Sequence, residues 1–165
     1  MRTEADKAIH ELKVFVEFAA RMTELNIDLS SIEKREPPEP DIRAANGSGE
    51  ITAFELVELC SPEIAQLLTV IRKEGNDETR FIRPQIPGEQ IINKKLDKNY
   101  NTPHPIELLC YTNGRTMTPD DVSIPTLKYC VDQSNNNPFR RIWYMGEEVI
   151  ELVKVEDRSA VDVHR

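Results

Sequence analysis

Two carboxylates, Asp41 and Glu55, lie on either side of a turn at Gly47-Ser48-Gly49. A three-residue loop at this turn pairs Asn46 with Glu50, and the same register places Asp41 opposite Glu55. Opposed residues of an antiparallel pair have Cβ atoms roughly 4.5–5.5 Å apart. Two carboxylates at that separation repel each other, so the pattern predicts a cation between or beside them.

The prediction depends on loop length and on the burial of Glu55. A two-residue loop would pair Asp41 with Phe54 and turn the two carboxylates to opposite faces. Glu55 shares one strand face with four apolar residues, namely Ile51, Ala53, Val57 and Leu59. An ionised carboxylate in such surroundings requires compensation. A metal ion could supply it, and so could an ion pair with a lysine or arginine.

The elements that position this pair begin with a helix predicted over residues 3–25. Its apolar stripe is expected at Ile9, Leu12, Val16 and Ala19, widened by Phe15, Phe18, Met22 and Leu25. Glu11 lies on the flank with the two phenylalanines and is expected nearer the core than Glu17. Three prolines then predict an extended connector over residues 26–40.

Strands are predicted over residues 41–46 and 50–60, and the second is apolar on both faces, which is typical of a central strand covered by helices. The remaining elements are helices over 61–74, 89–99 and 118–133, a buried strand over 106–112, and a strand pair over 139–145 and 149–155. The order predicts an α/β fold with a mixed central sheet flanked by helices. We expect a single domain over residues 1–155 and a polar tail over 156–165.

Composition limits the class of protein. The chain has 165 residues and a net charge of −8, which argues against a protein that simply coats nucleic acid. Its longest apolar runs, about six residues, are far short of the ~20 that span a bilayer, so no membrane partner is expected. Three separated cysteines and a charged N-terminal start predict a cytoplasmic protein with reduced thiols.

Two segments resemble a known family. "EPPEPDI", which ends on Asp41-Ile42, and "ITAFELVEL", which contains Glu55, resemble the PD-(D/E)xK nuclease superfamily. Pro40-Asp41 matches the PD of the motif, and Glu55-Leu56-Val57 falls where (D/E)xK is expected. The resemblance implies a restriction-endonuclease-like core: a helix, a hairpin or three-stranded meander, a helix and a further strand. Val57 occupies the lysine position, and valine can neither orient a water nor stabilise charge.

The family often supplies the lysine from the following helix, and "QIINKKLDKNY" offers Lys94, Lys95 and Lys98. Lys95 is the first choice, because it lies at the edge of the apolar stripe formed with Ile91 and Ile92 and could reach inward. Lys98, three residues further on, is the second. The alternative is that all three are solvated surface lysines.

The resemblance also implies a chemistry, namely hydrolysis of phosphodiesters assisted by Mg²⁺ or Mn²⁺. Asp41, Glu55, the backbone carbonyl of Leu56 and Glu11 are the implied metal ligands. The ion would activate a water, and Lys95 or Lys98 would position that water and offset negative charge. DNA is favoured over RNA as the substrate.

Other functions stay open at this point. The missing motif lysine and the charge of −8 favour a catalytically inactive relative that acts as a binding or protein-interaction module. An unrelated α/β binding protein with structural ion pairs at Asp41 and Glu55 is a third option. Between Arg80 and Tyr100, five basic residues face two acidic ones, which indicates either a phosphate-facing strip or a solvated helix face. A homodimer is one option for assembly.

Overall fold

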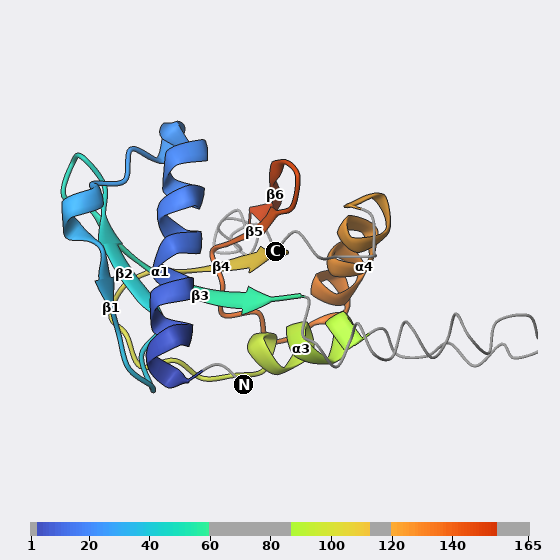
Figure 1. Cartoon of the computed structure of the whole chain (residues 1–165). Helices are drawn as coiled ribbons and strands as arrows, with labels where there is room; N and C mark the ends of the chain where they lie inside the picture. The colour runs from blue at the N-terminus through green and yellow to red at the C-terminus, as the bar shows by residue number, and fades with distance from the viewer. Residues whose placement is uncertain (1–2, 60–86, 113–119, 155–165) are drawn as a thin grey trace, which may run out of the picture.

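The computed structural model describes residues 3–59, 87–112 and 120–154. Over these residues the chain forms an α/β fold with a six-stranded mixed sheet (Figure 1). The strands follow chain order across the sheet: β1 (Glu33–Lys34), β2 (Ile42–Ala45), β3 (Ile51–Glu58), β4 (Ile106–Tyr111), β5 (Arg141–Met145) and β6 (Val149–Lys154). Strands β3, β4 and β5 run parallel, and the other neighbours are antiparallel. The predicted fold class is confirmed at this level.

Helices cover both faces of the sheet. α1 (Glu4–Arg21) packs on one face, whereas α3 (Pro87–Leu96) and α4 (Asp120–Gln133) pack on the other (Figure 1). The start of α1 is a capping box, in which Thr3 and Asp6 satisfy each other's backbone N–H groups. The helix ends at Arg21 rather than near residue 25, and two short 3₁₀ helices follow it, η1 (Thr23–Leu25) and η2 (Leu29–Ser31).

The buried face of α1 differs from the predicted stripe. Ile9 and Val16 are 53% and 42% exposed, while the residues that face the sheet are Glu11, Val14, Phe15, Phe18 and Ala19. Both faces are apolar, and the face with two aromatic rings buries more surface, packing them against Phe54 and Trp143. One consequence is that Glu11 is carried into the interior.

The predicted connector over residues 26–40 is more ordered than an extended linker. It contains η2 and the two-residue strand β1, which pairs antiparallel with β2 so that Lys34 lies opposite Ile42. β1 was not predicted, because a two-residue strand of polar residues has no hydrophobic alternation. The pairing brings Lys34 beside the start of β2.

The hairpin has the predicted register. The Asn46 N–H donates to the Glu50 carbonyl at 2.9 Å, and Ile42 pairs with Phe54. The three-residue loop ends on Gly49, whose φ of +83° is a left-handed conformation that L side chains rarely adopt. The register that opposes Asp41 and Glu55 is therefore the one observed.

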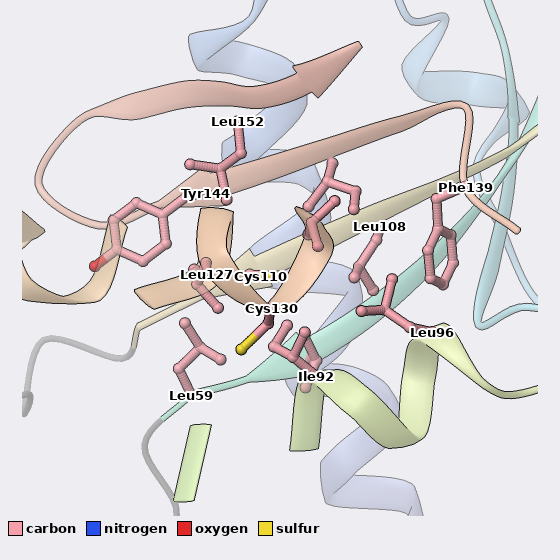
Figure 2. Close-up of a cluster of buried hydrophobic side chains, with 13 residues drawn as sticks. Leu59, Ile92, Leu96, Leu108, Cys110, Leu127, Cys130, Phe139, Tyr144 and Leu152 are labelled. Carbon is pink, nitrogen blue, oxygen red and sulfur yellow. The ribbon is translucent and has the colours of Figure 1, made fainter. Parts of the chain in front are cut away.

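Strand β3 is covered on both faces, as predicted. Phe54 and Leu56 belong to the apolar cluster beneath α1, and Val57 and Leu59 belong to a second cluster beneath α3 and α4 (Figure 2). The side chains of Cys110 and Cys130 are buried. Within the described part of the chain, no helix is both long and apolar enough to cross a membrane.

The later elements agree with their predictions within a few residues. α3 begins at Pro87 and ends at Leu96, α4 ends at Gln133 as expected, and β4 and the β5–β6 pair are present. The helix predicted over 61–74, Cys60, and the tail over 156–165 lie outside the described residues.

Replacing Gly49 by Ala is expected to lower the free energy of unfolding by about 1–2 kcal/mol, because a Cβ disfavours the left-handed conformation. The space around this glycine is open, so the loss would be conformational rather than steric. Urea unfolding followed by circular dichroism measures the change. Gly49→Asn is the control, since Asn tolerates this conformation and should recover part of the loss. An equal loss in both variants would contradict this role of Gly49.

Candidate functional site

Asp41 and Glu55 lie side by side, each anchored by the backbone of the other strand. The Leu56 N–H donates to Asp41 Oδ2 at 2.9 Å, and the Asp41 N–H donates to Glu55 Oε2 at 3.2 Å. Glu55 is only 1% exposed. These reciprocal bonds fix both carboxylates in place at the point where β2 begins, and they bring together the two acids that the register predicted.

Two lysines reach Glu55 from α3 and the residues just after it. Lys95 Nζ lies 2.5 Å from Glu55 Oε1, and Lys98 Nζ lies 3.5 Å from the same oxygen. Ile92 and Leu96 lie on the buried side of α3, so Lys95 of the same helix is at the border between core and solvent, with its side chain 24% exposed. The two lysines contact Glu55 in the order of preference that the sequence indicated, whereas Lys94 is exposed.

A third lysine, Lys34, was not predicted at this site. Its Nζ lies 2.7 Å from Glu11 Oε2 and 3.3 Å from Asp41 Oδ1, so it bridges two carboxylates. Burial lowers the pKa of Lys34, but the hydrogen bond to Glu11 and the charges of Asp41 and Glu11 outweigh it and leave the pKa raised. The pairing of β1 with β2 places Lys34 here, and no local pattern of residues indicates that pairing.

Tyr100 is a second residue that the sequence analysis missed. Its ring lies 4.9 Å from Lys98 Nζ and packs against Phe139, and its hydroxyl donates to the Lys95 carbonyl at 3.4 Å. Burial, followed by the negative charges of Glu55 and Asp41, raises the pKa of the phenol. Tyr100 thus supports the two lysines and stays protonated beside the carboxylates.

Apart from the exposed Lys7, whose Nζ lies 3.8 Å from Glu11 Oε1, the charges of this cluster balance. Its three carboxylates are Glu11, Asp41 and Glu55, and its three ammonium groups are Lys34, Lys95 and Lys98. They approach from both faces of the sheet, since Glu11 belongs to α1 and Lys95 to α3. The lysines provide the compensation that a carboxylate as buried as Glu55 needs.

Another buried acid, Glu107, has a different environment. Trp143 Nε1 donates to its Oε2 at 2.7 Å, and Arg140 Nη2 donates to its Oε1 at 2.8 Å. Trp143 and Phe139 are buried and pack in the core. Glu107 is therefore held by the neighbouring strand β5 and the residue that precedes it, as part of the sheet.

The oxygen atoms of Asp41, Glu55 and the Leu56 carbonyl are of the kind that binds a hard divalent cation. Within residues 3–59, 87–112 and 120–154, no three or more His, Cys, Asp or Glu side chains are grouped to hold a metal ion. Mg²⁺ commonly takes only one or two carboxylates and keeps several waters. Glu55 Oε1 already accepts from Lys95 and Lys98, whereas Glu55 Oε2 and the two Asp41 oxygens each accept one hydrogen bond from the described residues and have a further lone pair. Asp41, Glu55 and the Leu56 carbonyl are the residues that would hold the ion. Glu11 lies beyond the Lys34 amine, and its role as a ligand stays a prediction.

Comparison of the chain with protein-family models, with curated proteins and with solved structures found no significant match.

Replacing Lys95 by Met is expected to lower the free energy of unfolding by roughly 1–3 kcal/mol, because a buried carboxylate loses its nearest cation while Lys98 remains. Lys94→Met is the matched control. It removes the same charge from an exposed neighbour and should change stability by less than about 0.5 kcal/mol. Thermal and urea unfolding compare the two, and equal effects would show that Lys95 does not stabilise Glu55.

Above about pH 10, the free energy of unfolding is expected to fall as pH rises. Tyr100 and Lys34 both have a raised pKa in the folded chain, from ordinary values of 10.0 and 10.5. The unfolded chain therefore releases these protons first, and the slope of unfolding free energy against pH is negative. Their contribution is complete below the ordinary values and is lost as pH rises through the folded ones.

Urea unfolding between about pH 8 and 11, without added metal, measures this slope. Tyr100→Phe should make it shallower, whereas Tyr129→Phe, which changes an exposed residue, should leave it as in the wild type. A Tyr100 variant with an unchanged slope would contradict the link to Tyr100.

Proposed function

We propose that this chain is a nuclease-like protein that hydrolyses nucleic-acid phosphodiesters with the help of Mg²⁺ or Mn²⁺. The observation that carries the proposal is the position of the Lys95 amine, 2.5 Å from Glu55 Oε1, while the other oxygen of Glu55 accepts from the Asp41 N–H. Two carboxylates and one lysine are thereby combined at one point, although Lys95 lies 40 residues after Glu55 in the chain. This is the set of groups that the PD-(D/E)xK motif implies.

The order of the elements supports a restriction-endonuclease-like core. α1 is followed by the antiparallel strands β1, β2 and β3, and later by α3 and then β4, which runs parallel to β3. A helix, a three-stranded meander, a helix and a further strand are the elements of that core. The carboxylates lie on β3 and at the start of β2, where the motif requires them.

The valine at the motif lysine position has a structural role. Val57 is buried in the same apolar cluster as Ile92 and Leu96 of α3 (Figure 2 labels both α3 residues). Packing of this cluster holds α3 against the sheet, and in this position of the helix the Lys95 amine contacts Glu55. The chain can therefore lose the motif lysine and still present an amine to the same carboxylate.

Each group has a distinct part in the proposed reaction. Asp41, Glu55 and the Leu56 carbonyl would bind the ion. A bound divalent ion supplies activation of a water nucleophile and neutralises charge on the phosphate. Lys95 would hold that water by hydrogen bonding and offset the negative charge that develops on the phosphoryl oxygens. Lys98, whose side chain is 40% exposed, provides positive charge on the solvent side for the nucleic-acid backbone.

A catalytically inactive binding module with the same fold is the second candidate. The balance between three carboxylates and three lysines favours it, because the cluster is neutral without any added ion. In that case the ion pairs would stabilise the fold, and the function would reside on another surface, with a protein as the partner.

Mn²⁺ binding by titration calorimetry and cleavage of plasmid DNA, DNA oligonucleotides and RNA oligonucleotides test the proposal. We expect the wild type to bind Mn²⁺ and to cleave DNA, and Asp41→Asn to lose both activities. Lys95→Met should still bind Mn²⁺ but cleave about 10²–10³-fold more slowly, because it lacks a group that stabilises developing charge. Lys94→Met is the control and should cleave as the wild type does.

Failure of the wild type to bind Mn²⁺ or Mg²⁺ would reject the metal-dependent function. Ion binding without cleavage of any of these substrates would instead support the inactive binding module.

A further inference from the structure

The space between Glu11 and Asp41 is filled by the amine of Lys34. We infer that this ammonium group takes the place of a second divalent cation, so that the site holds one metal ion and Lys34 serves as its permanent second cation. This role of Lys34 rests on the proposed function, because it concerns the number of ions at the same carboxylates.

The geometry of Lys34 is that of a bridging cation. Its Nζ contacts Glu11 Oε2 at 2.7 Å and Asp41 Oδ1 at 3.3 Å, and thus joins α1 to the start of β2. The backbone on either side is fixed, since Lys34 pairs with Ile42 and the Arg35 N–H donates to the Asp41 carbonyl at 2.8 Å. The pairing of β1 with β2 therefore places the Lys34 amine between Glu11 and Asp41.

Two carboxylates that share one cation are also the usual arrangement around a divalent ion. With the amine present, one oxygen of each acid is already bonded, and a second cation would face a like charge at close range. Lys95 and Lys98 contact Glu55 Oε1, at the opposite end of the Asp41–Glu55 pair. Removing Lys34 would accordingly open a cation position at the Glu11 end and leave the other end as it is.

Glu11 acquires a specific purpose in this arrangement. Its side chain is 6% exposed, and it holds the Lys34 amine rather than the ion itself. In the wild type, Glu11 is then a positioning residue for Lys34. It becomes a ligand only when the amine is absent.

The test counts bound Mn²⁺ by titration calorimetry and by electron paramagnetic resonance of free Mn²⁺, on the full chain. The wild type should bind one ion, and Lys34→Met should bind two. Lys7→Met is the matched control, because Lys7 approaches the other oxygen of Glu11 at 3.8 Å but is 60% exposed, and this variant should still bind one. The double variant Lys34→Met/Glu11→Gln should return to one ion.

Two further variants keep the test decisive if Lys34→Met does not fold, which circular dichroism would reveal. Lys34→Gln retains a polar side chain and should also bind two ions, while Glu11→Gln alone should bind one with an affinity within about twofold of the wild type. Two ions on the wild type, one ion on a folded Lys34 variant, or loss of the ion in Glu11→Gln would overturn the role of Lys34 while the proposed function stands. No ion on the wild type would reject the proposed function itself.

Discussion

Burial of the Glu55 carboxylate is the constraint on which the site depends. A carboxylate that is 1% exposed on a central strand must be bonded and compensated, and every element nearby contributes to this. The Asp41 backbone donates to it, Lys95 and Lys98 neutralise it, and Asp41 is in turn held by the Leu56 N–H and Lys34. The site is therefore a set of charges that satisfy one another across both faces of one sheet.

The two buried acids on β3 and β4 show how similar compensation can serve different purposes. Glu107 is bonded by Trp143, from an adjacent strand, and by Arg140, whose guanidinium also bonds Thr52 and Glu50, so both partners are tied to the sheet. Glu55 is neutralised by flexible, partly exposed lysines from a separate helical segment. Lysine amines can be displaced or redirected when a cation or a phosphate arrives. A chemical role therefore suits Glu55 better than Glu107.

Much of the site could be predicted because local rules determine it. The three-residue turn ending on Gly49 sets the hairpin register, and the register alone opposes Asp41 and Glu55. The apolar stripe of residues 91–96 oriented α3 well enough to favour Lys95 over Lys94. The prediction of the buried face of α1 was wrong in part, since Ile9 and Val16 are exposed. The apolar arc of this helix is wider than the surface that contacts the sheet, so the pattern does not indicate which part of the arc is buried.

The α/β order of elements, the doubly covered strand β3 and the opposition of the two acids could all be read from the residues alone, because each follows from periodicity or turn geometry over short spans. Only folding of the whole chain brings the Lys34 amine to Glu11 and the Tyr100 ring to Phe139. Each of these contacts joins segments far apart in the sequence, so no short-range pattern predicts it. Strand pairing of β1 and packing of α3 against the sheet create them, and both depend on the whole core.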